Sequence, residues 1–396
     1  MDIPAFSISA LPGIVFGDGV RRRLPELAAT FGRRVLLVTG AASFTQSAAW
    51  PELLAGLQAQ GLSHAHVRVS GEPSPQLADA LAQQFRGENM DVVIGIGGGS
   101  VLDAAKAVAG LLRVDNSVMD FLEGVGPELP YNGPATPFIA VPTSAGTGSE
   151  ATKNAVLSVQ GKNGFKKSFR HETLVPRYAV IDPELLATCP QTLIAADGMD
   201  ALTQLLESYV SLKANPFTDA LALSGITAVR DALLPWYMGE GDLAAHRRAM
   251  AYAALLSGIT LAQVGLGSVH GLAAPLGAFF PIPHGVVCGT LVANCSEMNV
   301  RAMRQREPLN PALDKYAVLG RLLIRQTELS DDAACQALID LLLQWTTDLQ
   351  LPLLSAYGMQ AADIPRVVAN CRGSSMKTNP ISLNDDEVAE ILEERL

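Results

Sequence analysis

The segment from Met90 to Lys106, MDVVIGIGGGSVLDAAK, limits the possible folds more than any other part of the chain. Residues 92–96 form the short, β-branched apolar run expected of a central parallel strand. The glycines that follow let a ligand approach the backbone, and the N-terminus of the next helix suits a pyrophosphate. The segment therefore predicts a nucleotide site in an α/β fold. The alternative is a glycine turn with no ligand.

The spacing of this segment differs from the two common phosphate motifs. A G-x-G-x-x-G fingerprint would need a glycine at Ser100, and no G-x-x-x-x-G-K-[ST] occurs in the chain. Ser100 is expected to cap the helix, and Asp103 and Lys106, one turn apart, are expected to pair. The pattern predicts phosphate binding without naming a particular nucleotide.

The order of elements predicts an α/β N-terminal part and an all-α C-terminal part. Residues 6–8 and 14–16 resemble a short hairpin, and helical and strand patterns then alternate up to residue 181, which indicates a parallel sheet with helices on both faces. A second glycine and hydroxyl loop, residues 142–150, follows a predicted strand. Only helical patterns follow, so we expect a dinucleotide-binding domain over residues 1–185 and a metal and substrate domain over residues 186–396.

Composition excludes several classes of protein. The 396 residues are 48% hydrophobic and only 17% charged, which excludes disorder, and the net charge of −10 argues against nucleic acid and anionic membranes as partners. Five scattered cysteines without C-x-x-C spacing argue against a disulfide framework and against a cysteine zinc site, and they fit a reducing cytoplasm. No signal peptide is recognisable. The apolar window 250–267 is interrupted by polar residues and glycines, so it predicts a buried helix rather than a membrane span.

Four polar side chains in the helical part are candidate metal ligands. Asp200 and Gln204 lie four residues apart, on one face of a predicted helix, and His270 and His284 follow later in a chain with only six histidines. Two imidazoles and a carboxylate suit zinc or iron(II) with a position left for substrate. Each histidine taken alone is more often an interior group than a ligand, and spacing does not decide between the two.

Several ordered motifs resemble the iron-containing, or group III, alcohol dehydrogenases. They are GGGSVLDAAK at 97–106, PTSAGTGSE at 142–150, VIDPELLATCP at 180–190, GMDALTQLLE at 198–207, GLGSVHGLAAPLGA at 265–278 and PHG at 283–285. The resemblance covers nearly the whole chain. It implies a nucleotide-binding domain, a helical domain with a divalent metal, Fe²⁺ or Zn²⁺, and a homodimer.

The resemblance also implies roles for individual residues. It places at the NAD or NADP cofactor Gly40, Gly97, Gly98, Gly99, Ser100, Asp103, Thr143, Ser144, Thr147 and Lys166. Asp200, His270 and His284 would be the catalytic metal ligands. Gln204 stands at the fourth ligand position, where the family usually has histidine, and Ala274 replaces a further histidine that the family often carries. Gly40 stands where members that favour NAD often have aspartate, so NADP is accommodated.

The predicted reaction is hydride transfer between a nicotinamide and a small alcohol, aldehyde or ketone, with the metal as Lewis acid. One alternative is a lyase like dehydroquinate synthase, which uses NAD and a metal. It would need a basic cluster for a phosphorylated sugar acid, and none is evident near the candidate ligands. The other alternative is a nucleotide-binding protein that has lost catalysis.

Overall fold

A computed structural model describes residue 3 and residues 5–396, and the chain forms two compact units. The α/β unit contains Ser9–Val159 and Gly164–Cys189. The helical unit contains Pro190–Leu396, Gln160–Asn163 and the described residues up to Ile8. Each unit is described separately below.

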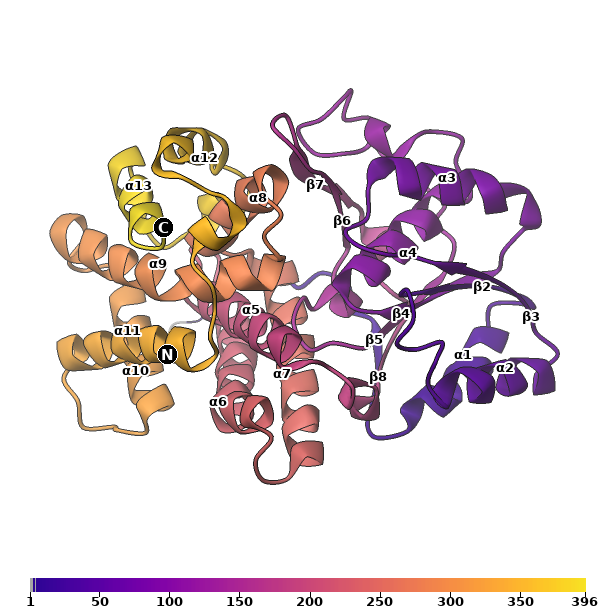
Figure 1. Ribbon diagram of the computed structural model, residues 1–396, viewed down its shortest axis with the longest axis horizontal. Helices are drawn as coiled ribbons and strands as arrows, with labels where there is room; N and C mark the ends of the chain where they lie inside the picture. The colour runs from indigo at the N-terminus through magenta and orange to yellow at the C-terminus, as the bar shows by residue number, and fades with distance from the viewer. Residues whose placement is uncertain (1–2, 4) are drawn as a thin grey trace. The chain divides into compact units, whose positions relative to one another are not determined.

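The α/β unit is built on a six-stranded parallel sheet (Figure 1). Its strands are β1 (Gly13–Phe16), β2 (Arg34–Thr39), β3 (Ser63–Arg68), β4 (Val92–Gly97), β5 (Phe138–Pro142) and β8 (Tyr178–Ile181). The order across the sheet is β1-β8-β5-β4-β2-β3. The predicted parallel α/β fold is confirmed, and β4 lies between β2 and β5, as expected of a buried apolar strand.

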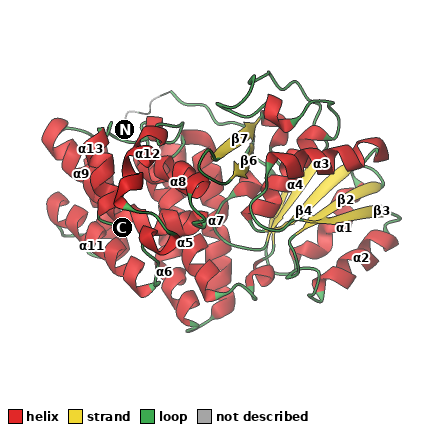
Figure 2. Ribbon diagram, turned by 45° about the horizontal axis from the view of Figure 1, so that its top comes forward, coloured by secondary structure: helices red, strands yellow, loops and turns green. Residues whose placement is uncertain are grey.

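Helices cover both faces of this sheet, as Figure 2 shows. They are α1 (Leu24–Ala29), α2 (Ala49–Ala59), α3 (Pro75–Phe85) and α4 (Gly99–Leu111). Neighbouring residues of β2 point to opposite faces: Leu37 packs in one core with α1 and α2, and Leu36 in another with α3 and α4. Burial on both faces explains why the strands read as continuous apolar runs.

Two features of the α/β unit differ from the sequence-based prediction. The hairpin at residues 6–8 and 14–16 is wrong: residues 14–16 belong to β1, which pairs in parallel with β8, and residues 6–8 form no strand. β1 pairs with residues far along the chain, which local turn residues cannot indicate. A second, antiparallel sheet of β6 (Asn154–Val159) and β7 (Phe165–Arg170) was not predicted.

The helical unit consists of longer helices. They are α5 (Gln191–Val210), α6 (Pro216–Met238), α7 (Leu243–Val264), α8 (Ser268–Phe279), α9 (His284–Arg306), α10 (Ala312–Ile324), α11 (Asp331–Asp348), α12 (Ile364–Asn370) and α13 (Asp385–Glu393). α5 is buried along most of its length. A Cβ at Gly285 would lie 2.5 Å from the Ala196 carbonyl oxygen, and one at Gly289 2.8 Å from the Met199 Cβ. These glycines therefore let α9 pack closely against α5.

Short 3₁₀ helices connect the longer elements. They are η1 (Val20–Arg23), η2 (Arg86–Glu88), η3 (Val118–Asp120), η4 (Ser149–Ala151), η5 (Glu172–Leu174), η6 (Pro183–Leu186), η7 (Leu354–Tyr357), η8 (Ala361–Asp363) and η9 (Met376–Thr378). Within the described residues, no single helix has the length and apolar character needed to cross a membrane. Helices α7 and α8 meet that test only as a pair, with a bend of 100° between them.

Candidate functional site

The glycine turn lies between β4 and α4, at the carboxyl edge of the parallel sheet. Gly97 and Gly99 are required by packing, since a Cβ at Gly97 would lie 2.5 Å from Val101 and one at Gly99 2.5 Å from Thr147. Gly98 is different, because its Cβ would meet only the Ser144 Oγ at 3.4 Å. The absence of a side chain at Gly98 therefore leaves space next to the N-terminus of α4.

The start of α4 differs from the sequence-based prediction at one residue. Gly98 is the N-cap residue, with φ −72° and ψ −178°, and no side chain of the described residues caps the helix. Ser100 is the second residue of α4 and does not cap it. Because no side chain occupies the cap, this helix terminus offers its backbone N–H groups and dipole to an anionic group.

The loop after β5 lies against the glycine turn. The Thr143 N–H donates to the Gly97 carbonyl oxygen at 3.0 Å, and Ser144 and Thr147 are the nearest neighbours of Gly98 and Gly99. These sequence-predicted residues are thus brought together at one edge of the sheet. We call Gly97–Ser100 with Thr143–Thr147 the phosphate cradle.

A buried cluster of charges supports the phosphate cradle from behind. The Lys106 ammonium donates to the carbonyl oxygens of Ser149 (2.7 Å) and Asn154 (2.8 Å), and the Ser149 hydroxyl donates to Asp103 Oδ1 at 2.6 Å. Ser149 therefore bridges the predicted Asp103 and Lys106 pair. Burial raises the pKa of Asp103, raises the pKa of Glu150 to about 7 and lowers the pKa of Lys106 to about 8.

The two remaining predicted cofactor residues lie elsewhere in the α/β unit. Gly40 follows β2, and its Cβ would lie 3.7 Å from Val101 of α4, an ordinary contact. Lys166 on β7 forms an ion pair with Glu72 at 2.9 Å. Position 40 therefore borders the first turn of α4 and has room for a side chain.

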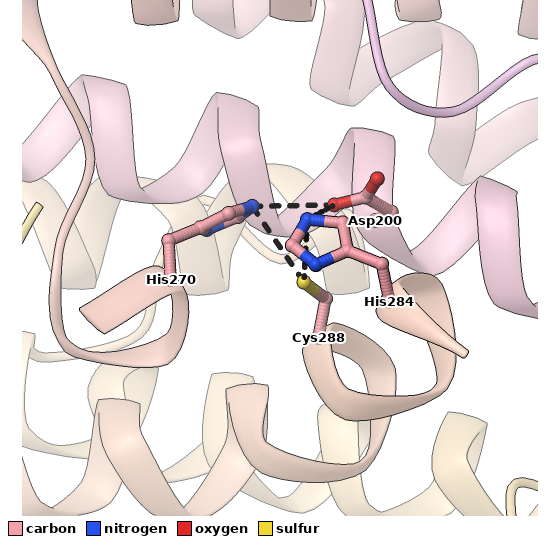
Figure 3. Close-up of side chains that lie close together, drawn as sticks. All are labelled: Asp200, His270, His284 and Cys288. Atoms are coloured by element: carbon pink, nitrogen blue, oxygen red, sulfur yellow. Dashed lines mark hydrogen bonds and ion pairs between the residues drawn. The ribbon is translucent and has the colours of Figure 1, made fainter. Parts of the chain in front are cut away.

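In the helical unit, four potential metal ligands converge from three helices (Figure 3). They are Asp200 of α5, His270 of α8, and His284 and Cys288 of α9, and their ligand atoms all lie within 4.8 Å of one another. Asp200 Oδ1 lies 3.2 Å from His270 Nε2 and 3.9 Å from His284 Nε2. Cys288 Sγ lies 3.6 Å and 3.8 Å from the same two nitrogens. We call these four residues the ligand cluster.

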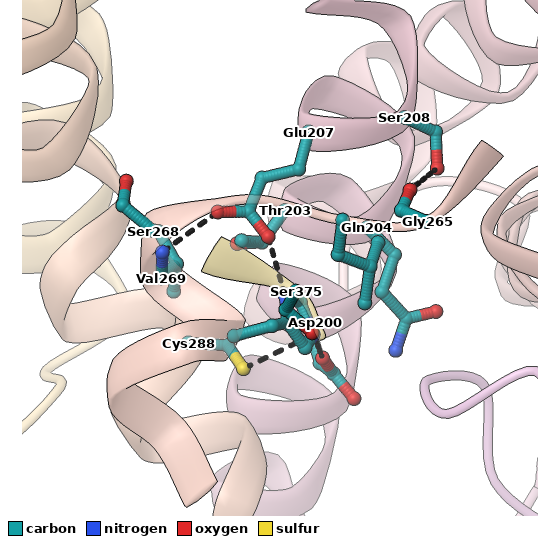
Figure 4. A network of polar contacts seen from close by, with 12 residues as sticks. Asp200, Thr203, Gln204, Glu207, Ser208, Gly265, Ser268, Val269, Cys288 and Ser375 are labelled. Carbon is teal, nitrogen blue, oxygen red and sulfur yellow. Dashed lines mark hydrogen bonds and ion pairs between the residues drawn. The ribbon is translucent and has the colours of Figure 1, made fainter. Parts of the chain in front are cut away.

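The Glu207 carboxylate lies beside Val269 of α8 (Figure 4) and orients the next residue, His270. Glu207 Oε2 lies 2.6 Å from His270 Nδ1, and Glu207 Oε1 accepts the Val269 N–H at 2.7 Å. With Nδ1 held against Glu207, the other ring nitrogen, Nε2, faces the cluster. Metal-binding histidines are commonly held by such a carboxylate.

Electrostatics keep the carboxylate of the ligand cluster ionised. Burial alone would raise the pKa of Asp200, but the neighbouring His284 and His270 lower it to about 2. Burial raises the pKa of the Cys288 thiol to about 12. Without a cation, the cluster therefore combines a charged carboxylate with a neutral thiol.

The ligand cluster fits a divalent metal. With zinc bond lengths of about 2.0–2.3 Å, neighbouring ligands of a tetrahedral site lie about 3.3–3.6 Å apart. The four measured separations are 3.2 to 3.9 Å. Asp200 Oδ2 is also buried and has no hydrogen-bond partner among the described residues, an arrangement that is unfavourable unless a cation or water completes it.

Gln204 has another partner in this structure. Its Oε1 accepts a hydrogen bond of 2.7 Å from Ser257, and both side chains are buried. Ser257 thus occupies one acceptor site of the oxygen that would bind a metal. Ala274 lies on α8, one helical turn after His270.

Sequence reasoning missed two residues of this site, although helical spacing offered a signal for both. Cys288 follows His284 by four residues, and Glu207 follows Asp200 by seven, so each shares a helix face with a predicted ligand. The missing C-x-x-C spacing argues against a metal site built from several cysteines, but it does not exclude a single cysteine that shares a helix face with a histidine. Glu207 ends the motif GMDALTQLLE, on the helix face of Asp200.

Comparisons with known proteins agree with this arrangement. The family "Iron-containing alcohol dehydrogenase" matches residues 12–183, and "Fe-containing alcohol dehydrogenase family, C-terminal" matches residues 194–396. "NAD-dependent methanol dehydrogenase" of Bacillus methanolicus is 30% identical, over 97% of this chain and 98% of the relative. "Probable alcohol dehydrogenase EutG" of Escherichia coli (strain K12) is 33% identical, over 82% of this chain and 78% of the relative.

A solved structure agrees as well. A 1,3-propanediol oxidoreductase superimposes with a TM-score of 0.89 at 29% identity, over 99% of this chain and 100% of that one. These matches support an oxidoreductase of alcohols and aldehydes and do not favour the lyase alternative. The chain therefore belongs to the iron-containing alcohol dehydrogenase family.

Proposed function

We propose that this chain interconverts a small alcohol and its aldehyde or ketone, with a nicotinamide cofactor held by the α/β unit and a divalent metal held by the helical unit. The observation that carries the proposal is the ligand cluster, in which a buried Asp200 oxygen has no hydrogen-bond partner. We propose that residues 1–185 bind the dinucleotide and that residues 186–396 bind the metal and the substrate.

The proposed metal ligands are Asp200, His270 and His284, with Gln204 at the edge of the site, and the first three are the proposed catalytic residues. When bound, the metal supplies a Lewis acid that polarises the substrate oxygen and stabilises charge on it. Asp200 contributes the fixed negative charge that attracts the cation, and Glu207 holds His270 in the tautomer that presents Nε2. Ala274 offers no proton-transferring group, so the substrate proton must leave by another route.

The phosphate cradle is the proposed binding site for the cofactor pyrophosphate. Its support is the uncapped N-terminus of α4 beside three hydroxyl side chains, those of Thr143, Ser144 and Thr147. Asp103 contributes through Ser149 rather than by facing the ligand. Lys166 is kept as a proposed cofactor contact, with its ammonium oriented by Glu72.

We further propose that the site accepts NADP as well as NAD and leans toward NADP. Gly40 carries no carboxylate to repel a 2′-phosphate, and Arg68 ends the neighbouring strand, in register with Thr39 and exposed to solvent. His66, which bonds Thr39 at 2.8 Å, lies on the same face of β3. A guanidinium beside the ribose position suits a phosphate dianion. The NAD-dependent methanol dehydrogenase relative supports use of NAD.

Cofactor preference is tested by comparing kcat/KM for NADPH and NADH with one aldehyde. We expect NADPH to be used at least as well as NADH, and Arg68→Ala to lower the NADPH value about tenfold with little change for NADH. Gly40→Asp should shift the ratio toward NADH. Arg34→Ala is the matched control, because Arg34 lies at the opposite end of β2. A wild-type preference for NADH above about a hundredfold, roughly 2.7 kcal/mol, would contradict the proposal.

The reaction itself is tested by aldehyde-dependent oxidation of NADPH or NADH over a panel of carbonyl compounds, with metal analysis of the same protein. Turnover that requires bound metal supports the proposal. Cofactor binding without turnover of any carbonyl would favour the alternative of a nucleotide-binding protein that has lost catalysis. Full turnover by demetallated protein would show that the reaction does not need a metal as Lewis acid.

We also propose that the protein is a cytoplasmic homodimer. Among the described residues, none of the five cysteines forms a disulfide, which suits a reducing compartment. Light scattering of the purified protein tests the dimer.

A further inference from the structure

Cys288 belongs to the ligand cluster, although none of the sequence motifs indicated it as a ligand. Its sulfur lies 3.6 Å from His270 Nε2 and 3.8 Å from His284 Nε2. The side chain follows His284 by one turn of α9, so both project from one face of that helix, and the residue is fully buried. Figure 3 shows the sulfur facing the two imidazoles and the Asp200 carboxylate.

The separations match what a shared ion would require. A zinc ion with nitrogen ligands at about 2.05 Å and a sulfur ligand at about 2.3 Å places sulfur and nitrogen about 3.6 Å apart. The two sulfur to nitrogen distances agree with this value to within a few tenths of an ångström. The buried Asp200 Oδ2, which has no hydrogen-bond partner, is an independent sign that the cluster is built for a cation.

Gln204 is a weaker candidate for the same place. Its amide oxygen already accepts a hydrogen bond from Ser257, and a neutral amide is a poorer ligand for zinc or iron than thiolate or imidazole. Cys288 in contrast gives a soft, negatively charged donor once its proton leaves. With Asp200, a thiolate would bring two negative charges to the ligand set, which balances a divalent cation.

We propose that Cys288 is a thiolate ligand of the metal and that the resulting Asp, His, His and Cys set prefers zinc to iron(II). The inference rests on the proposed function, because it takes the ligand cluster as the metal site. Binding a divalent ion forms the sulfur to metal bond and releases the thiol proton to solvent. Soft thiolate ligands favour zinc over iron(II) beyond the general order of divalent affinities.

Cobalt(II) reports the sulfur bond directly. Demetallated protein loaded with cobalt(II) should show a sulfur-to-cobalt charge-transfer absorption in the near ultraviolet, and Cys288→Ser should lose it while keeping the visible cobalt bands. Cys295→Ser is the matched control, because it removes another buried thiol of α9 and should keep the absorption. Wild-type protein that binds cobalt without this absorption, or a Cys288→Ser variant that retains it, overturns the inference.

Metal competition tests the preference. Demetallated protein equilibrated without oxygen with equal zinc(II) and iron(II) is expected to take up mainly zinc, and Cys288→Ser should lower the bound zinc-to-iron ratio at least tenfold. An unchanged ratio overturns the preference for zinc. If wild-type protein binds none of these ions, the proposed metal-assisted function fails too. If it binds cobalt without the charge-transfer band yet reduces aldehydes, only the role of Cys288 fails.

Discussion

The candidate site of the α/β unit is formed mainly by backbone groups, whereas that of the helical unit is formed by side chains. In the α/β unit, the phosphate cradle is mostly backbone: glycines leave space, and a helix N-terminus offers N–H groups. In the helical unit, the ligand cluster is side chains alone, brought from α5, α8 and α9. A larger side chain at a glycine should therefore weaken cofactor binding at the first site, whereas loss of a ligand side chain should weaken metal binding at the second.

The supporting charges differ in the same way. Behind the phosphate cradle, Lys106 contacts backbone carbonyl oxygens and so fixes the loop rather than a ligand. Behind the ligand cluster, Glu207 contacts a proposed ligand itself. Changes to the buried charges of the α/β unit should therefore appear in stability, whereas changes around the ligand cluster should appear in metal affinity.

The largest effect is expected from Asp200→Ala. Asp200 supplies the fixed negative charge of the ligand cluster, so its loss should leave metal content near zero and lower aldehyde reduction at least about a thousandfold, roughly 4 kcal/mol. Elemental analysis and steady-state rates measure both. Cofactor affinity should remain within about twofold, because the phosphate cradle belongs to the other unit. A metal-free variant with wild-type rates would contradict the assignment.

A second, smaller effect concerns the charges behind the phosphate cradle. Burial raises the pKa of Glu150 from 4.5 to about 7, so between these pH values the folded state holds a proton that the unfolded state has lost. This contribution to stability is complete below pH 4.5 and is lost as the pH rises to 7. It amounts to at most about 3 kcal/mol. Glu150→Gln cannot ionise and should lack it.

Urea unfolding of both proteins at several pH values between 4.5 and 7.5 isolates this term. The wild-type free energy of unfolding should fall relative to that of Glu150→Gln as the pH rises. Lys106 has a pKa of about 8, which its interaction with Glu150 raises, so the two proteins are best compared in the acidic part of this range, where Lys106 keeps its charge in both. Parallel pH profiles would mean that Glu150 is ionised in the folded protein throughout.

The comparison also explains what the sequence could reveal. The β4 strand, its glycines and the α4 helix are contiguous, so apolar pattern and turn chemistry together predicted the element order and the nucleotide site. The strand at residues 14–16 was predicted, but its pairing was wrong because its partner β8 lies more than 160 residues away. The pair of β6 and β7 was missed because FKKSFR, the sequence of β7, shows little apolar character.

In the helical unit, residue type and spacing offered Asp200, His270 and His284 only as candidate ligands, and the family resemblance gave them that role. Which side chains meet is decided by the close packing of α9 on α5 at Gly285 and Gly289. Spacing within one helix cannot reveal that contact. Cys288 therefore emerged only with the structure, although it stands one turn from a predicted ligand.

The smallest effect is expected from Gly98→Val, which tests whether the phosphate cradle is defined by space. The φ of −72° at Gly98 suits any residue, so the backbone strain that positive φ would cause does not arise, and the new Cβ meets only Ser144 Oγ at 3.4 Å. We expect a loss of stability of about 1 kcal/mol, from the poorer N-cap residue. The Kd for NADPH should rise about tenfold, near 1.4 kcal/mol, because the side chain fills the space left for phosphate.

Gly97→Val is the matched contrast. Its Cβ would lie 2.5 Å from Val101, so we expect it to lower the stability of the fold before it affects cofactor binding. Thermal unfolding and fluorescence titration with NADPH measure the two effects, and a Gly98→Val protein that binds NADPH with unchanged affinity would place the phosphates elsewhere.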